Sequence, residues 1–226
     1  MDVIINDVRG KKHEFSQVEA MLFDLDGTLI HSLDLHIEAF QEILNQMGKS
    51  VSRYDLEPLM GLTPQDIIQK FTPELSHQQI WQAALEKEDH LSTIIKEIHV
   101  FPHVVELLTQ LALFNVKKVV ISSTHQRLVI LLLEAAGIMD LIDEVVSGDE
   151  VKNGKPNPDP FLLGMNKAKA STSTTIAIGD SLHDQNSAKA AFIPFLSLLT
   201  GKTDKEAFDQ NEAKMIIANL ASITIR

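Results

Sequence analysis

Four short polar clusters contain the residue types that could carry chemistry, and each follows an apolar run. They are Asp24-Leu25-Asp26-Gly27-Thr28, Ser122-Ser123-Thr124, Gly154-Lys155-Pro156, and Gly179-Asp180-Ser181 followed by Asp184. Carboxylates packed together repel one another unless a cation lies between them, and oxygen ligands are those that Mg²⁺ prefers. The carboxyl groups of Asp24, Asp26 and Asp180 therefore predict a magnesium site.

The spacing of Asp24 and Asp26 suits covalent catalysis by one carboxylate and acid–base catalysis by the other. Attack by Asp24 would give an aspartyl-phosphate, while Asp26 could protonate the leaving group and then activate water. Lys155 adds a compact positive charge for a phosphoryl oxygen or for the nucleophile, and Ser122 can donate a hydrogen bond to the same group. This combination predicts a site for a phosphate monoester.

Each cluster also has a structural explanation when it is considered alone. An Asp-x-Asp-Gly run is most often a turn, a Lys-Pro run is usually a rigid loop, and the two serine-containing clusters could simply cap helices. An EF-hand is excluded, because Leu29 and Leu35 stand where that loop requires Gly and Glu. The occurrence of all four clusters in order, each after an apolar run, favours a single chemical site.

The histidines and the single Trp and Tyr carry weaker signals. His31 and His183 lie next to the clusters and are candidates for substrate contacts, whereas the other histidines are scattered without the spacing of a metal-binding pair. Trp81 and Tyr54 are expected to pack against other residues instead of stacking on a substrate. No Gly-x-Gly-x-x-Gly or Walker-type loop is present, so a bound nucleotide cofactor has no support.

The elements that would position the clusters alternate along the second half of the chain. Apolar runs predict strands at 21–23, 118–121, 144–147, 175–178 and 193–197. Helical spacing predicts helices at 103–114, 125–136, 159–170 and 184–191. This alternation is typical of an α/β fold with a doubly wound parallel sheet, whose ligands bind beyond the carboxyl ends of the strands. The four clusters are therefore expected at one edge of the sheet.

A helical block interrupts this series after its first strand. Helices are predicted at 34–47, 64–71 and 77–98, with no strand among them. We therefore expect an α/β core domain made of residues 1–32 and 101–226, with an inserted all-α domain at 33–100. Residues 1–18 are left unassigned beyond a short extension against the sheet domain.

Composition restricts the setting and the partners. The net charge of −11 and pI near 5.2 disfavour binding to nucleic acid and to anionic membrane surfaces. The absence of cysteine removes disulfides and thiolate metal sites, and no export signal or membrane span is recognisable, so a cytoplasmic location is expected. The expected partner is a small phosphorylated metabolite, and the oligomeric state is not indicated.

The four clusters resemble the motifs of the haloacid dehalogenase-like superfamily of Asp-nucleophile hydrolases. The helical block is similar to the α-helical cap of its phosphoglycolate phosphatase and β-phosphoglucomutase-like branch. The carboxylate of Asp26 points to a phosphatase or phosphomutase, since the dehalogenases and ion-pumping relatives lack it. Ser123, where Asn is frequent, and Ala191-Phe192, where an Ala-Gly pair is expected, depart from the pattern.

The resemblance implies a role for each matching residue. Asp24 would be the nucleophile, and Asp26 the general acid and base with its backbone carbonyl on the metal. Asp180 would be a metal ligand, and Asp184 would support the metal shell or Lys155. Ser122 and Lys155 would bind the phosphoryl group. Supporting or substrate-binding positions are Gly27, Thr28, Ser123 and Ser181.

The sequence thus predicts a Mg²⁺-dependent phosphatase that acts on phosphoglycolate or a sugar phosphate through an aspartyl-phosphate on Asp24. A sugar phosphomutase of the β-phosphoglucomutase type is the enzymatic alternative, because the motifs do not separate the two reactions. A catalytically silent binding module is disfavoured, since Asp24, Asp26, Lys155 and Asp180 are all present.

Overall fold

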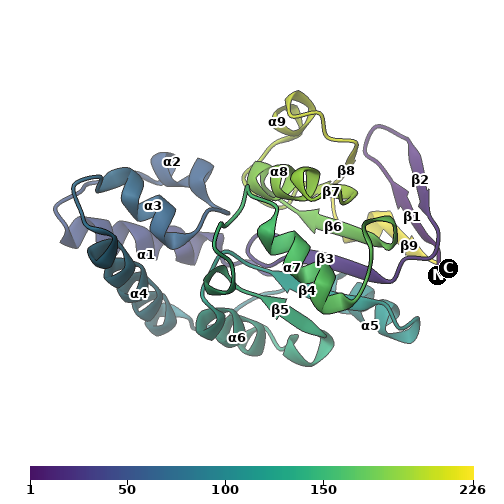
Figure 1. Cartoon of the computed structure of the whole chain (residues 1–226), viewed down its shortest axis with the longest axis horizontal. Coiled ribbons are helices and arrows are strands. Elements are labelled where there is room, and N and C mark those ends of the chain that lie inside the picture. Colours follow the sequence, from purple (N-terminus) through teal and green to yellow (C-terminus); the bar gives the residue numbers. More distant parts are fainter.

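A six-stranded parallel sheet with helices on both faces forms the centre of the molecule (Figure 1). The computed structural model describes residues 1–226. In spatial order the strands are β5 (Glu144–Val146), β4 (Lys117–Ile121), β3 (Ala20–Asp24), β6 (Thr175–Gly179), β7 (Phe195–Leu198) and β8 (Met215–Ile217). The accompanying helices are α5 (Val104–Leu113), α6 (Gln126–Ala135), α7 (Asp159–Ala168), α8 (Leu182–Ala190) and α9 (Lys205–Gln210). The predicted α/β fold is confirmed.

Strand β3 shows how the sheet divides the interior into two layers. Met21 and Phe23 face a hydrophobic cluster that includes α5 and α6, whereas Ala20 and Leu22 face a second cluster that includes α7 and α8. All five residues of β3 are buried, as is typical of a parallel strand covered on both faces. The strand ends at Asp24, which is thereby fixed in the middle of the sheet edge.

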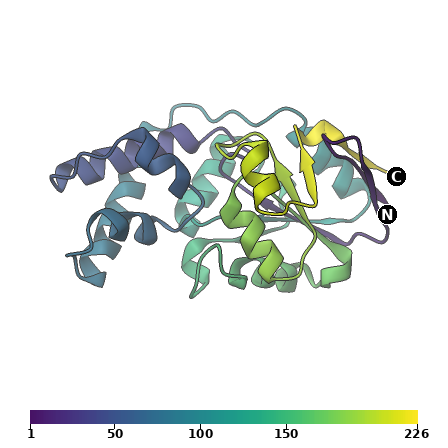
Figure 2. The same cartoon turned by 90° about the horizontal axis from the view of Figure 1, so that it is seen from above.

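The segment between β3 and α5 is helical and has a hydrophobic core of its own. It contains α1 (Leu33–Gln46), α2 (Arg53–Leu56), α3 (Pro64–Phe71) and α4 (His77–Ile94). We call this region, residues 33–94, the cap helices. In α1 the buried Ile37, Phe40 and Leu44 follow helical spacing and pack against apolar residues of α3 and α4. Both projections place the cap helices at one end of the molecule (Figures 1 and 2).

Helix α4 begins at a capping box and ends earlier than the pattern predicts. The side chains of Ser76 and Gln79 satisfy each other's backbone N–H groups at its start. The helix stops at Ile94 instead of residue 98, since the backbone of Ile95 is extended, and Ile98 is buried in the core of the sheet domain.

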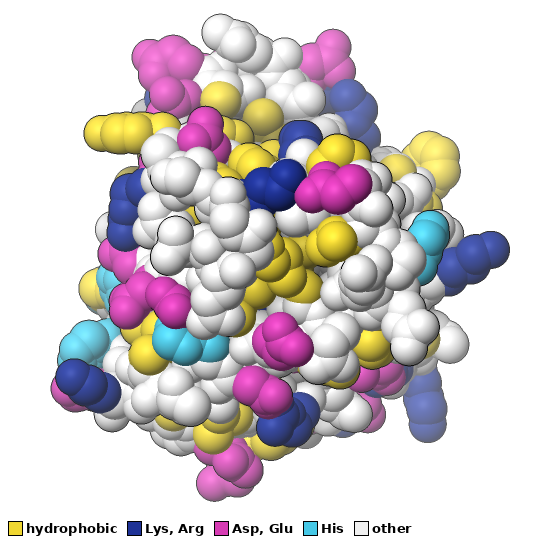
Figure 3. Space-filling model, turned by 90° about the vertical axis from the view of Figure 1, so that its left-hand side faces the viewer, with side chains coloured by type: hydrophobic (Ala, Val, Ile, Leu, Met, Phe, Trp, Pro, Cys, Tyr) yellow, Lys and Arg dark blue, Asp and Glu magenta, His cyan; other side chains and the backbone are white.

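On the end formed by the cap helices, charged side chains of both signs surround exposed apolar ones (Figure 3).

The N-terminal residues form strands that the sequence analysis did not anticipate. Strands β1 (Val3–Asn6) and β2 (Lys12–Phe15) join β9 (Ile223–Ile225) in an antiparallel sheet of order β2-β1-β9. The turn after β1 then reaches the edge strand β8 of the main sheet. There the N–H of Val8 donates to Ile216 O and the N–H of Ile216 donates to an Asp7 oxygen, each at 2.9 Å. Residues 1–18 therefore cover a sheet edge that would otherwise present unpaired backbone groups.

Tyr54, which was expected to pack, is 83% exposed on α2, so that prediction is wrong; the short helix turns it away from the core of the cap helices. None of the helices combines the length and apolar character that a membrane-spanning helix needs.

Candidate active site

The four polar clusters meet at the carboxyl edge of the main sheet. Asp24 ends β3, Ser122 follows β4, and Asp180 follows β6. Lys155 lies in the loop between β5 and α7 and reaches Asp24 across the edge. This is the location expected for ligand-binding residues of an open α/β sheet.

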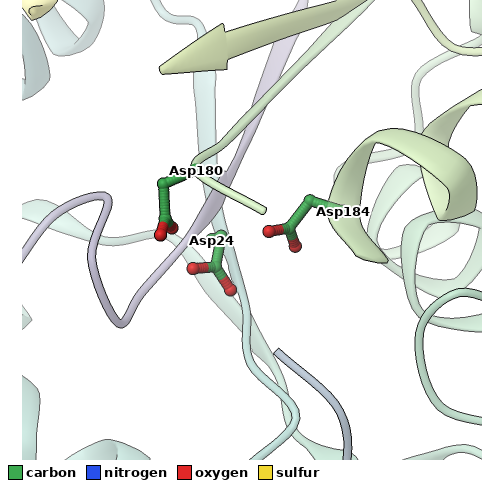
Figure 4. Close-up of side chains that lie close together, drawn as sticks. All are labelled: Asp24, Asp180 and Asp184. Carbon is green, nitrogen blue, oxygen red and sulfur yellow. The ribbon is translucent and has the colours of Figure 1, made fainter. Parts of the chain in front are cut away.

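Three carboxylates form a buried cluster at this edge. Oxygens of Asp24, Asp180 and Asp184 lie within 4.8 Å of one another, and all three residues are buried. Asp184 projects from the first turn of α8 toward the other two (Figure 4). It belongs to a capping box with Ser181, whose Oγ donates to Asp184 Oδ2 at 2.5 Å. The helix cap therefore fixes one carboxylate of the cluster.

Lys155 provides positive charge inside the cluster. Its Nζ donates to Asp24 Oδ1 at 2.5 Å and to Ile121 O at 2.8 Å, and lies 2.7 Å from Asp184 Oδ1. The residue is only 1% exposed. Burial would lower the pKa of Lys155, but the charges of Asp184 and Asp24 outweigh it and raise that pKa above its usual value. Lys155 is thus a permanent cation.

One lysine does not balance three carboxylates. Burial raises the pKa of Asp24 well above its usual value, and the charge of Asp184 adds to this effect. Burial and Asp184 likewise raise the pKa of Asp180 to about 7. Oxygen donors that repel one another in a buried site fit a hard divalent cation, which would restore their ionised state. The donor set thus suits a divalent metal.

Glycines and hydroxyls shape the surroundings of Asp180. Thr28 Oγ1 donates to Asp180 Oδ1 at 2.8 Å. Gly27 has φ +93°, and a Cβ there would lie 2.5 Å from Asp180 Oδ2. A Cβ on Gly201 would lie 1.7 Å from the same oxygen. Gly201 was missed by the sequence analysis, because a lone glycine after a strand carries no signal of this contact.

Asp26 lies beside the cluster, but its carboxylate is held by other groups. Ser32 Oγ donates to Asp26 Oδ1 at 2.5 Å, and His36 Nε2 lies 3.1 Å from the same oxygen. Ser122 Oγ is 3.5 Å from the other oxygen, Oδ2. Burial would raise the pKa of Asp26, but the charge and contact of His36 and the Ser32 hydrogen bond lower it to about 2. The side chain of Asp26 is therefore directed at α1 and Ser122.

His36 and Lys87 of the cap helices enter the site and were missed by the sequence analysis. Lys87 Nζ lies 2.7 Å from His36 Nδ1 and 4.5 Å from the centre of the Phe40 ring, and Lys87 is fully buried. Burial lowers the pKa of Lys87 to about 8. A signal existed in the pattern, since Lys87 interrupts the apolar face of α4 that contains Ile80, Ala84 and Leu91.

The remaining predicted residues have more local roles in the structure. Ser123 Oγ donates to Gly61 O at 2.6 Å and so links the loop after β4 to the segment between α2 and α3. His31 stacks on Phe101 with ring centres 3.6 Å apart. His183 Nε2 is 3.2 Å from Pro58 O. Neither histidine lines the pocket that contains Asp24 and Asp26.

That pocket lies between the sheet edge and the cap helices and is nearly closed. Its volume is about 30 Å³. The lining combines Asp24 and Asp26 with His36 and Lys87, and with apolar side chains that include Phe40. A cavity of this size has room for only a few water molecules. We therefore expect the cap helices to move when a larger substrate enters.

Sequence comparison relates this chain to a known family of hydrolases. A sequence model of the family "haloacid dehalogenase-like hydrolase" matches residues 21–198. A phosphorylated carbohydrates phosphatase of Thermotoga maritima is 29% identical, over 78% of this chain and 82% of that protein. Phosphoglycolate phosphatase of Shigella boydii is 26% identical, over 92% of each chain. Protein SUPPRESSOR OF QUENCHING 1 of Arabidopsis thaliana is 28% identical over 94% of this chain, which spans only 21% of that protein.

Solved structures show the same fold. A hydrolase of Pseudomonas syringae superposes with a TM-score of 0.82 at 24% identity, covering 89% of this chain and 94% of that one. A β-phosphoglucomutase of Clostridium difficile superposes with a TM-score of 0.80 at 21% identity, covering 89% and 91%. These two likenesses bear on the fold alone. The family model, which matches most of the chain, shows that the chain belongs to the haloacid dehalogenase-like hydrolase family.

Proposed function

We propose that this protein is a Mg²⁺-dependent phosphatase that hydrolyses a small phosphate monoester through an aspartyl-phosphate on Asp24. The observation that carries the proposal is the environment of Asp24. Its carboxylate is buried, lies 2.5 Å from Lys155 Nζ, and shares the site with the carboxylates of Asp180 and Asp184. A carboxylate in such a position is suited to nucleophilic attack on a phosphorus atom whose oxygens are neutralised by cations.

Asp24, Asp180 and the backbone carbonyl of Asp26 are the groups that would hold the metal ion, with Asp184 beside them. Mg²⁺ is the ion that suits such carboxylate oxygens together with retained water molecules. When bound, the ion supplies positive charge that offsets the negative oxygens of the phosphoryl group. Gly27 and Gly201 keep space free beside Asp180, where a side chain would displace its carboxylate.

Asp24 and Asp26 divide the reaction between them. A carboxylate oxygen of Asp24 attacks phosphorus while the ester P–O bond breaks, and Asp26 gives the leaving oxygen a proton. In the second step Asp26 takes a proton from water, whose oxygen attacks the phosphorus and releases Asp24 and inorganic phosphate. His36 at 3.1 Å and Ser32 at 2.5 Å orient the Asp26 carboxylate, and the Asp26–His36 pair is where we place the transferable proton.

Lys155 and Ser122 would position the phosphoryl group. Lys155 is fixed by two carboxylates and a backbone carbonyl, so its charge stays in place when Asp24 becomes phosphorylated. The Ser122 hydroxyl lies between the end of β4 and Asp26 and can donate to a phosphoryl oxygen. Both groups stabilise the transferring phosphoryl group without changing their own position.

The small closed pocket supports a small substrate. Its volume of about 30 Å³ in the closed state leaves little room for a large leaving group. Lys87 lines the pocket and suits a substrate that carries a second anionic group or hydroxyls. Two of the relatives are named for such compounds, as a phosphoglycolate phosphatase and a phosphorylated carbohydrates phosphatase. We therefore propose phosphoglycolate or a sugar phosphate as the substrate.

The test is release of inorganic phosphate from a panel that contains phosphoglycolate, sugar phosphates, nucleotides and an aryl phosphate, with Mg²⁺ and with chelator. We expect metal-dependent release, fastest with the small anionic or sugar esters. Release that is unaffected by chelation would contradict the metal's role. Conversion of a sugar phosphate to its isomer without net phosphate release would identify a mutase instead.

A further inference from the structure

A carboxylate of the cap helices lies at the start of a helix of the sheet domain. Glu88 of α4 accepts a hydrogen bond from the backbone N–H of His125 at 3.1 Å. Its second oxygen lies 3.0 Å from His125 Nδ1. Glu88 is 1% exposed and His125 is 6% exposed. This contact between the two regions is thus almost completely removed from water.

His125 precedes α6, whose first N–H groups have no partner within the helix. The side chain of His125 makes no capping hydrogen bond at this end of α6. The N–H of Gln126 is satisfied by Asp149 Oδ1 at 2.9 Å. The N–H of His125 depends on Glu88, which is 37 residues away in sequence. When the cap helices move away, this donor loses its protein partner and is left to water.

The ring of His125 is also enclosed by the cap helices. Gln65 Nε2 of α3 lies 2.9 Å from His125 Nε2. The Trp81 ring of α4 packs at a tilt against the histidine ring, with centres 5.0 Å apart. With Glu88, three side chains from α3 and α4 therefore surround one side chain of the sheet domain.

The short loop between β4 and α6, which ends at His125, contains the hydroxyl groups proposed for phosphoryl binding. Ser122, Ser123 and Thr124 connect β4 directly to His125. The N–H of Thr124 donates to Ser122 Oγ at 3.2 Å, and Ser123 Oγ donates to Gly61 O of the cap helices at 2.6 Å. Only three peptide bonds therefore separate His125, which Glu88 contacts, from Ser122.

We propose that Glu88 is a positioning residue that couples closure of the cap helices to ordering of the phosphoryl-binding loop 122–125. The inference rests on the proposed function, because it assigns loop 122–125 to the phosphoryl group. Glu88 touches no reacting atom. It completes the start of α6 only in the closed state, so the loop reaches its binding geometry only when water has been excluded from the site.

The kinetic test compares two neighbouring carboxylates of α4. Asp89 pairs with Arg127 of α6 on the surface, whereas Glu88 pairs with His125 in the interior. Glu88→Ala should lower kcat/KM for the best ester by tenfold to a hundredfold, on the order expected for an orphaned buried donor. Its inhibition constant for inorganic phosphate should rise in parallel. Asp89→Asn should stay within about twofold of wild type.

Glu88→Gln separates positioning from simple loss of stability. The amide oxygen that this change introduces can still accept from the N–H of His125 although the charge is lost. The value of kcat/KM in Glu88→Gln should therefore stay within about threefold of wild type. Recovery of activity with the melting temperature still lowered would support the proposal. Equal losses of kcat/KM in Glu88→Gln and Glu88→Ala, or an equal loss in Asp89→Asn, would overturn it.

Hydrogen exchange provides a readout that does not depend on catalysis. In Glu88→Ala, peptides that cover 121–127 should exchange faster than in wild type, while Asp89→Asn should leave them unchanged. Unchanged exchange of these peptides in Glu88→Ala would refute the coupling. If the wild-type protein releases phosphate from no ester, the proposed function fails, and the exchange experiment still decides the role of Glu88.

Discussion

The α/β core and the cap helices contribute charge of opposite sign to the same pocket. The core supplies Asp24 and Asp26 at the end of β3, and α1 and α4 supply His36 and Lys87. The core groups are fixed by strand ends and by a helix cap, whereas the cap groups reach the site only while the two regions are in contact. The pKa of Asp26 therefore depends in part on residues of the cap helices, since burial would raise it and His36, with the Ser32 hydrogen bond, lowers it to about 2.

The packing explains why the two regions can behave differently. The cap helices have their own cluster of 12 buried apolar residues, separate from the clusters on either face of the sheet. Movement of the cap helices as a unit would leave their own cluster intact, but it would break polar interactions and also the contacts that Ala39 and Leu91 make with the cluster of the sheet domain. We expect substitutions in the core to affect the chemistry most, and substitutions at the contact between the regions to affect it less.

The largest effect is expected for Asp24→Asn. The amide is nearly the same size but is a poor nucleophile, so phosphate release should fall by roughly four orders of magnitude or more. The measurement is steady-state phosphate release at saturating Mg²⁺, with the melting temperature as a check on folding. Asp140→Asn, at an exposed position after α6, is the matched control. Near-normal turnover in Asp24→Asn would rule out the proposed nucleophile.

His36→Gln tests the contribution of the cap helices to the same reaction. Loss of the group beside Asp26 Oδ1 should lower kcat by about tenfold to a hundredfold, which is less than loss of the nucleophile. The effect should be on kcat more than on KM, because His36 orients the acid and base instead of the phosphoryl group. An unchanged kcat would mean that the core sets the state of Asp26 alone.

Metal binding should stabilise the core. At a hundredfold excess over its Kd, Mg²⁺ should add about 3 kcal/mol to the free energy of unfolding and raise the melting temperature by several degrees. Thermal unfolding with Mg²⁺ and with chelator measures this difference. In Asp180→Asn the shift should shrink, because one of the carboxylate donors is removed. A shift of the same size in that variant would exclude Asp180 as a ligand.

Substitution of Asp7 tests a part of the core that is remote from the cap helices. Burial would raise the pKa of Asp7, but hydrogen bonds from Arg9 and from the N–H of Ile216 lower it to about 2. The folded pKa lies below the unfolded value near 4, so the stabilisation is complete above pH 4 and is lost as the pH falls toward 2. Asp7→Asn should lower the free energy of unfolding by about 2 kcal/mol at pH 7 and by less at pH 3.

Urea unfolding at the two pH values measures this difference, and phosphate release at 25 °C should be unaffected. A loss of stability as large at pH 3 as at pH 7 would contradict the ionised pair.

The smallest effect is expected for the exposed contact between the two regions. Lys202 of the core lies 3.6 Å from Glu57 and 3.8 Å from Asp34 of the cap helices, and its side chain is 39% exposed. Lys202→Met should change kcat/KM by no more than about twofold and stability by a few tenths of a kcal/mol. A loss comparable to that of Glu88→Ala would mean that surface charge, not the buried contact, controls closure.

The meeting of the polar clusters in the core could be predicted from the sequence because local signals coincide there. Each polar cluster follows an apolar run, and parallel strands bring such ends to one edge of a sheet. Asp184 was placed near Lys155 by resemblance, and the structure gives a distance of 2.7 Å. Strand and helix bounds differ by a few residues, as for the strand expected at 193–197 and found at Phe195–Leu198.

The features that could not be predicted from the sequence depend on contacts between segments that are distant along the chain. Val3 pairs with Ile225, and no local pattern specifies a pairing across the whole chain. His36 and Lys87 meet because α1 packs on α4, and each alone resembles a polar residue on a helix. The role of Glu88 is invisible in sequence for the same reason, since its partner is the backbone of His125.

The pairing of β1 with β9 brings the two chain ends together at the end of the molecule opposite the cap helices (Figures 1 and 2). Asp2 and Arg226 exchange two backbone hydrogen bonds, at 2.9 and 3.0 Å. A short linker could therefore join residue 226 to residue 1 without strain, and new ends could be opened at the exposed turn at Gly48. A circular permutant of this kind would separate α1 from the other cap helices in sequence while leaving every strand of the main sheet intact.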